Sequence, residues 1–285
     1  MPSEHFDAGW LALREPFDHA ARSIGLAQRL AAHLPEQRPR LIDLGAGTGS
    51  LFRFLAPIIG RGQSWTLLDA DAALLDDAFG RTAAWGRRQG FATAISGDEL
   101  AVITPRGTWR MQTHVADLAG ALPLADADAV VCSALFDLVS AAWLARLLDA
   151  LHVPLFASIV VDGRVTWRPR HRLDAFVMTA FRRDQQKEKG FGPALGGAAP
   201  AAALRAFANR GFATASAVTD WRVSRTALAM QRALIEGTAH AARIAAPQRA
   251  AAIEQWQIAR LRQAMRARLA ISVGHRDILA IPPGG

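Results

Sequence analysis

The sequence contains no tyrosine, a single cysteine, Cys132, and only two lysines among its 285 residues. One cysteine excludes an intrachain disulfide and any metal site made of several cysteines, and it agrees with a reducing compartment. No apolar run reaches about 18 residues, and Glu4, His5 and Asp7 stand where a signal peptide would carry basic and then apolar residues. We therefore expect a cytoplasmic protein without a resident metal, whose aromatic contacts come from tryptophan, phenylalanine or histidine.

The length and the charge bound the class of protein. With 285 residues, 51% of them hydrophobic, the chain can bury a complete core, and one α/β domain with additions accounts for its length. The net charge is +8, and most of the excess lies late in the chain, where ten arginines from Arg222 onward face three acidic residues. We interpret these arginines as a solvated face, and an RNA-binding role for them stays an alternative.

A short apolar segment runs into a glycine-rich turn at residues 40–50, RLIDLGAGTGS. Its glycines at 45, 47 and 49 have no Cβ, so the backbone can approach a ligand closely and can adopt positive φ. A dinucleotide-binding turn would place its third glycine at position 50, which is Ser50 here. An acid, Asp43, precedes the first glycine by two residues, which makes the pattern D-x-G-x-G-x-G.

Two further acids follow predicted strands. Asp69 ends the apolar segment 65–68, where its carboxylate can accept hydrogen bonds from both hydroxyls of a ribose. Asp117 follows the apolar segment 109–115. Together with the glycine turn, these acids resemble the class I S-adenosylmethionine (SAM)-dependent methyltransferases over residues 40–139. The alternative is three loop carboxylates beside an ordinary glycine turn.

The resemblance implies SAM as the cofactor, with Asp69 at its ribose and Asp117 at its adenine. The predicted cofactor-binding residues are Asp43, Gly45, Ala46, Gly47, Thr48, Gly49, Asp69, Ala70, Asp117, Leu118 and Ser133. The β-α-β-α rhythm and the resemblance predict an α/β fold, doubly wound around a seven-stranded, mostly parallel sheet with an antiparallel last strand. We expect one methyltransferase domain over 1–285, with a helical cap at 1–39, a cofactor-binding core at 40–167, a substrate lid at 168–197 and a C-terminal part of the sheet with helices at 198–285.

The N-terminal extension, residues 10–39, is predicted to be helical. Pro16 suits the first helical position, and apolar residues recur at spacings of three and four along one face. Arg14, Asp18 and Arg22 lie four residues apart on one face. They either reach the site or form a solvated row of ion pairs, and we favour the solvated row.

The loop after the fourth predicted strand, 129–132, should face the methyl group to be transferred. Enzymes that methylate amino groups of nucleic acids or glutamine usually carry Asn/Asp-Pro-Pro-aromatic there, and residues 133–139 lack this motif. Cys132 follows Val131 rather than the proline typical of a cysteine that attacks a pyrimidine. We therefore expect Cys132 to be a buried core thiol.

Asp137 and His171 are the candidates for a proton acceptor, because each stands just past the end of a predicted strand. Asp137 could instead cap the following helix, and His171 could lie on the surface of the lid. The lid is also basic, so an anionic acceptor is one option for arginines that bind carboxylate or phosphate: Arg170, Arg172, Arg182 and Arg183.

The last predicted helix has an apolar stripe and an arginine-rich remainder. We expect the stripe Ile258, Leu261, Met265 and Leu269 to be buried and the arginines to be solvated, namely Arg260, Arg262, Arg266 and Arg268. The whole pattern predicts SAM-dependent methyl transfer to a small-molecule acceptor, with no membrane partner. An RNA methyltransferase, a catalytically silent SAM-binding scaffold and a nicotinamide oxidoreductase are the alternatives.

Overall fold

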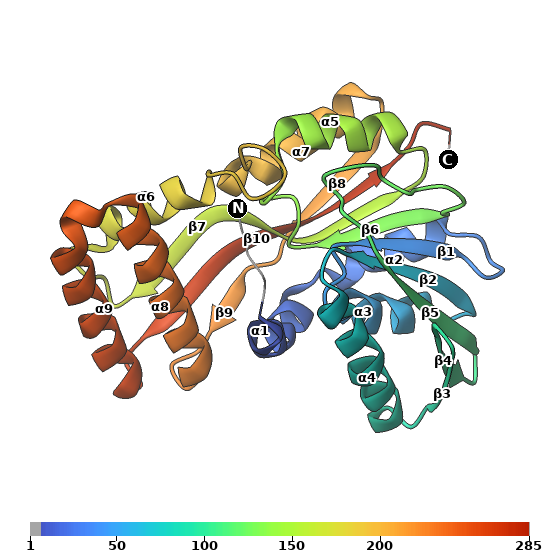
Figure 1. The fold of residues 1–285 in the computed structure, drawn as a ribbon, viewed down its shortest axis with the longest axis horizontal. Coiled ribbons are helices and arrows are strands. Elements are labelled where there is room, and N and C mark those ends of the chain that lie inside the picture. Colours follow the sequence, from blue (N-terminus) through green and yellow to red (C-terminus); the bar gives the residue numbers. More distant parts are fainter. Residues whose placement is uncertain (1–6, 285) are drawn as a thin grey trace.

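A single sheet of ten strands organises the computed structural model, which describes residues 7–284 (Figure 1). Along the sheet the order is β3-β4-β5-β2-β1-β6-β7-β10-β8, and β9 pairs with β10 beside β8. The strands are β1 (Arg40–Leu44), β2 (Gln63–Asp69), β3 (Ala92–Ser96), β4 (Glu99–Thr104), β5 (Gly107–Val115), β6 (Ala129–Ser133), β7 (Leu155–Arg168), β8 (Ala213–Val218), β9 (Trp221–Val223) and β10 (Ala270–Ile281).

The predicted fold class is confirmed. The five neighbouring strands β5, β2, β1, β6 and β7 are parallel, and β10 lies antiparallel between β7 and β8. The sheet is larger than the seven strands expected, because the segment before β5 adds β3 and β4 as antiparallel strands at one edge. Thr219 and Asp220 separate β8 from the short β9, and both of these strands pair with β10.

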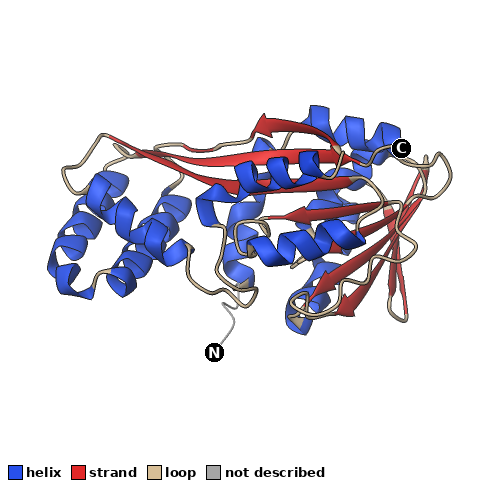
Figure 2. Cartoon of the chain, turned by 90° about the horizontal axis from the view of Figure 1, so that it is seen from above, coloured by secondary structure: helices blue, strands red, loops and turns tan. Residues whose placement is uncertain are grey.

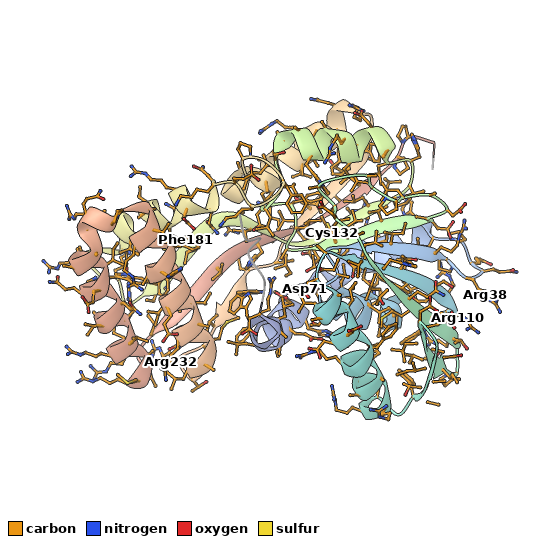
Figure 3. The ribbon with its side chains drawn as sticks, viewed as in Figure 1. Arg38, Asp71, Arg110, Cys132, Phe181 and Arg232 are labelled. Carbon is orange, nitrogen blue, oxygen red and sulfur yellow. The ribbon has the colours of Figure 1, made fainter. Side chains whose placement is uncertain are left out.

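Helices cover both faces of the sheet, as Figure 2 shows. One hydrophobic cluster packs α2, α3 and α4 against one face, and a second packs α5 and α7 against the other. The helices are α1 (Ala8–Ala21), α2 (Ile24–His33), α3 (Ser50–Ile59), α4 (Ala72–Arg88), α5 (Ala141–Ala150), α6 (Asp174–Gln185), α7 (Ala199–Asn209), α8 (Leu228–Ala245) and α9 (Ala250–Met265), with short 3₁₀ turns at Gly196–Ala198 and Pro247–Arg249. Cys132 lies in the middle of the sheet and is buried, as predicted (Figure 3).

Strands β7 and β10 extend beyond the parallel core and carry α6, α8 and α9 at one end of the molecule (Figure 1). β7 continues through Asp162 and Gly163 to Arg168, because β10 pairs with it along this length. The pairing shifts register between Val273 and His275. A Cβ at Gly274 would meet the Asp162 carboxylate at 2.2 Å, so glycine permits a bulge here instead of a turn.

The N-terminal extension forms two helices rather than one. The Asp7 side chain accepts a hydrogen bond from the Gly9 N–H and starts α1. Pro16 therefore lies inside that helix, whereas we predicted it at the first helical position. The chain then breaks at Arg22 and Ser23, and the Ser23 hydroxyl caps α2 by accepting from the Leu26 N–H. No helix among residues 7–284 is both long and apolar enough to cross a membrane.

The prediction for the last helix was confirmed for Leu269, which is buried, and for Arg262, Arg266 and Arg268, which are exposed, but it was wrong for Ile258, Met265 and Arg260. Ile258 and Met265 are exposed by 42% and 67%, whereas Arg260 is completely buried together with Ile253, Trp256 and Ala264. The guanidinium of Arg260 forms an ion pair with Asp174 at the start of α6 and donates to the Pro169 carbonyl at 2.7 Å. A charge with these partners can occupy a core position, which the hydrophobic pattern alone cannot predict.

Candidate functional site

The glycine turn joins β1 to α3 at the carboxyl edge of the parallel strands. Gly45, Gly47 and Gly49 all have positive φ, of 66°, 51° and 77°. A Cβ at Gly47 would lie 3.2 Å from Leu11 of α1, so the helix closes over the turn at a distance that only glycine accommodates easily. Ser50 is the first residue of α3. The turn therefore presents backbone to the space beneath α1.

A cavity of about 270 Å³, called here the glycine-turn cavity, opens beside this turn. The ends of β1, β2, β5 and β6 meet around it, together with α1 and the segment 189–191. The predicted residues that line it are Gly45, Gly47, Asp69, Ala70, Asp117, Leu118 and Ser133. A small adjoining cavity of about 60 Å³ is lined by Asp43, Ala46 and Thr48 among others. Gly49 lines neither cavity and is instead the N-cap of α3.

Asp69 holds the turn and still faces the glycine-turn cavity. One carboxylate oxygen accepts from the Gly47 N–H at 2.8 Å, and the other accepts from the Asp71 N–H at 3.0 Å. Burial raises the pKa of Asp69, and these backbone donors lower it in part. A carboxylate oxygen has two acceptor positions, so each oxygen can accept one further hydrogen bond from a ligand hydroxyl.

Asp43 is the most unusual group at the turn. Its side chain is 1% exposed, and neither carboxylate oxygen has a hydrogen-bond partner among residues 7–284. Burial raises its pKa to about 8, while the buried guanidinium of Arg22 lowers it and Asp69 raises it further. A buried carboxylate without a partner is costly, so this position is suited to a ligand that brings a cationic donor.

The row Arg14, Asp18 and Arg22 is not solvated, contrary to the preferred interpretation. Arg14 donates to Asp18 at 2.9 Å, and the pair lines the small cavity beside the turn. Arg22 is buried and donates to the hydroxyls of Ser50, Ser133 and Ser158 at 3.1, 3.0 and 3.2 Å. Arg22 thus connects the N-terminal helices to the start of α3, the end of β6 and a residue within β7.

A second cavity of about 440 Å³, called here the aromatic cavity, lies between α1, α8 and the extended strands β7 and β10. Four residues line both this cavity and the glycine-turn cavity: Arg14, Ala134, Leu138 and Lys189. Large apolar side chains form much of its wall, namely Trp10, Trp167, Phe181, Trp221, Ile271 and Val273. Phe181 lies on α6 at the end of the molecule where α8 and α9 also pack (Figure 3). Both volumes suit small organic ligands.

Asp137 lines the aromatic cavity between Ala134 and Leu138, two of the residues shared by both cavities. Its Oδ1 atom is buried and has no hydrogen-bond partner in the described part of the chain. Burial raises its pKa to about 6, and backbone N–H groups and Arg14 lower it. The cap of α5 is Ser140, whose hydroxyl accepts from the Trp143 N–H, so Asp137 does not serve as that cap.

The structure does not bring His171 to the site. Its ring Nδ1 accepts from the Leu173 N–H, and its backbone N–H donates to the Asp174 carboxylate. His171 therefore forms part of the turn that starts α6. The lid arginines predicted to bind an anion are exposed and line neither cavity: Arg170, Arg172, Arg182 and Arg183. β7 continues to Arg168, well past the other parallel strands, and this extension carries these residues away from the glycine turn.

Several residues of the site gave no signal in the sequence. Trp10, Trp221 and His275 come from α1, β9 and β10, far apart in the chain, and they meet only because β9 pairs with β10 beside α1. Lys189 belongs to the predicted lid, but its type and spacing matched no motif. A sequence pattern within one segment cannot reveal a cavity wall that is formed by three separate segments.

The comparisons with known proteins concern the fold only. No family model matches the chain, and no curated protein matches its sequence. Among solved structures, a SAM-dependent methyltransferase from Thiobacillus denitrificans in complex with S-adenosylhomocysteine is 16% identical, with 97% of this chain and 99% of that chain covered and a TM-score of 0.47. Geranyl diphosphate C-methyltransferase from Streptomyces coelicolor A3(2) is 13% identical, over 90% of this chain and 78% of that chain, with a TM-score of 0.40.

The cyclopropane synthase MmaA2 from Mycobacterium tuberculosis is 15% identical over 90% of this chain and 83% of that chain, with a TM-score of 0.42. These values are too low to transfer an activity, so the function proposed below rests on residues of this chain. The strand order β5-β2-β1-β6-β7-β10-β8, with β10 antiparallel and the glycine turn after β1, gives the chain the fold of the class I SAM-dependent methyltransferases.

Proposed function

We propose that the protein binds SAM in the glycine-turn cavity and transfers its methyl group to a small molecule held in the aromatic cavity. The observation that carries this proposal is the buried carboxylate of Asp43, which has no partner in the described part of the chain, at a turn of three positive-φ glycines. SAM has an α-ammonium group, which would provide the donor that Asp43 lacks. The second carboxylate, Asp69, has acceptor positions left for the two ribose hydroxyls.

The residues divide the chemistry between the two cavities. SAM, when bound, supplies an activated methyl group on a sulfonium. The protein then has to hold the acceptor in line with that methyl group, and such positioning can contribute roughly 7–11 kcal/mol to the lowering of the barrier. Asp137, whose pKa is about 6, is deprotonated at neutral pH and can take a proton from the nucleophile of the acceptor. Asp137 lines the aromatic cavity, and Ala134 and Leu138, which lie on either side of it in the sequence, line both cavities.

The direct test is methyl transfer from labelled SAM. The purified protein is incubated with labelled SAM in two separate reactions, one with the small-molecule fraction of a cell extract and one with its RNA fraction. We expect label in the small-molecule fraction and stoichiometric S-adenosylhomocysteine. Label in the RNA instead would support the arginine-rich C-terminal face as the acceptor site, and no transfer despite SAM binding would indicate a scaffold.

Asp69→Ala is expected to weaken binding of both SAM and S-adenosylhomocysteine by about 1.5–3 kcal/mol, the range for hydrogen bonds to a charged group. The variant loses the acceptors for the ribose and the bond that fixes the Gly47 N–H at 2.8 Å. Titration calorimetry measures the effect, and Asp76→Ala on the exposed side of α4 is the matched control. Equal affinity of Asp69→Ala and the parent protein would place the ribose elsewhere.

Asp43→Asn is expected to weaken SAM binding and to stabilise the ligand-free protein at pH 8. The pKa of Asp43 is raised to about 8, so the folded protein keeps a proton that the unfolded chain releases, and stability falls as pH rises from about 4 to 8. Asn cannot ionise, so this loss disappears. In a chain of this size each 1 kcal/mol corresponds to about 2–4 °C in Tm. Melting curves at pH 5 and pH 8 measure it, and a variant that binds SAM normally would contradict the assigned role of Asp43.

A further inference from the structure

His275 lies in the wall of the aromatic cavity and is not used by the chemistry described so far. It is 2% exposed, and its Nδ1 has no hydrogen-bond partner within residues 7–284. Its ring packs against Trp221 with 4.7 Å between ring centroids, and its backbone N–H donates to Asp220 at 3.2 Å. The ring is therefore held firmly, while a buried polar ring atom has no partner among these residues, which is unfavourable.

The charge state of His275 is also defined by its surroundings. Burial and the neighbouring guanidinium of Arg14 lower its pKa to about 4, while Asp18, Asp162 and Asp220 act in the opposite direction. The imidazole is neutral at physiological pH, so it offers one donor and one acceptor. It can thus bind a hydroxyl or carbonyl group but adds no charge to the cavity.

His275, on β10, and Asp137, in the loop between β6 and α5, are linked through Val161 of β7. His275 pairs directly with Val161 across β10 and β7, and the Val161 N–H is among the donors that act on the Asp137 carboxylate. Arg14 acts electrostatically on both side chains. Two residues that line one cavity therefore each carry a buried polar atom without a partner among the described residues.

The cations that line the cavity are already paired. Arg14 forms an ion pair with Asp18 at 2.9 Å, and Lys189 lies 3.8 Å from Asp184. An anionic acceptor would have to compete with these carboxylates. Apart from Asp184, Gln185, Thr238 and His240, the remaining wall is aromatic and aliphatic, with three tryptophans. The cavity is better suited to an uncharged ligand with a ring system than to a carboxylate or phosphate.

Resting on the proposed function, the geometry points to an uncharged, ring-containing acceptor with two hydrogen-bonding groups: one is the methylated nucleophile at Asp137, and the other is recognised by His275. His275 is then a specificity-determining residue. An acceptor that lacks the second group leaves the imidazole unsatisfied and binds less well.

Naphthols are suitable probes, and Trp10, Trp167 and Trp221 in the wall report their binding by fluorescence. The probes are the isomeric dihydroxynaphthalenes, the corresponding naphthols and a naphthalenedicarboxylate, titrated with and without S-adenosylhomocysteine. We expect the best dihydroxynaphthalene to bind about tenfold more tightly than its mono-hydroxy partner, and the dicarboxylate to bind most weakly. His275→Phe should reduce that tenfold preference to about twofold or less, whereas His275→Asn should retain most of it.

His152→Phe is the control, because His152 is an exposed histidine that lines neither cavity. It should keep the preference of the parent protein, and melting temperatures verify that each variant folds. An unchanged preference in His275→Phe, tightest binding of the dicarboxylate, or no binding of any dihydroxynaphthalene would overturn the inference. Failure to bind S-adenosylhomocysteine would contradict the proposed function separately, since the naphthol ranking is also measured without it.

Discussion

Asp137→Asn is expected to lower the rate of methyl transfer by about 10²–10⁴-fold, the usual contribution of a positioned general base. The substitution keeps the shape of the side chain but removes the group that can accept the proton. Asp137 lines the aromatic cavity and not the glycine-turn cavity, so affinity for S-adenosylhomocysteine should change by less than about twofold. Transfer of label from SAM into the small-molecule fraction measures the rate.

The pH dependence provides an independent test of the same residue. Burial raises the pKa of Asp137 to about 6, so the rate in the parent protein should rise as pH increases through about 6 and level off above it. Asp137→Asn should lose that rise. Asp149→Asn, an exposed position on α5, is the control and should behave like the parent. A full rate in Asp137→Asn would remove Asp137 from the mechanism and leave positioning as the main source of catalysis.

Asp174→Ala is expected to destabilise the protein by about 3–5 kcal/mol, because it leaves a fully buried guanidinium without its counter-ion. Asp174 also accepts from the Trp256 Nε1 at 2.8 Å, and Arg260 lies over the rings of Trp167 and Trp256. The pair thus connects the start of α6 to α9 and supports Trp167, a wall residue of the aromatic cavity. Urea unfolding measures the loss.

Two variants distinguish the buried charge from the loss of a surface pair. The double variant Asp174→Ala/Arg260→Met removes the unpaired charge as well and should be less destabilised than Asp174→Ala alone. Asp77→Ala removes the exposed i,i+4 pair with Arg81 on α4 and should cost less than about 1 kcal/mol. If Asp174→Ala and Asp77→Ala cost the same, the guanidinium of Arg260 reaches solvent or another partner.

The residues around the glycine-turn cavity could be predicted from the sequence because their positions depend on local features. The glycine turn follows β1, Asp69 is the last residue of β2 and Asp117 comes two residues after β5, and the carboxyl ends of parallel strands meet at one edge of the sheet. Each of these residues is therefore placed by its own segment. The order of the strands follows from the same right-handed crossovers.

The aromatic cavity could not be predicted, because it depends on how far β7 and β10 extend. The pairing of these strands up to Arg168 moves His171 away from the turn and brings His275 to the cavity. Buried charges were missed for a related reason. Arg22 and Arg260 read as surface residues in a hydrophobic pattern, and only their distant partners, Ser158 and Asp174, make burial acceptable.

Calorimetric titration of the purified protein with S-adenosylhomocysteine tests the central claim most directly, with NAD titrated in parallel. The proposed site predicts binding of one S-adenosylhomocysteine per chain, weakened in both Asp43→Asn and Asp69→Ala, and no heat from NAD. Binding of NAD without binding of S-adenosylhomocysteine would contradict the proposal and would indicate that the glycine turn serves a dinucleotide despite Ser50.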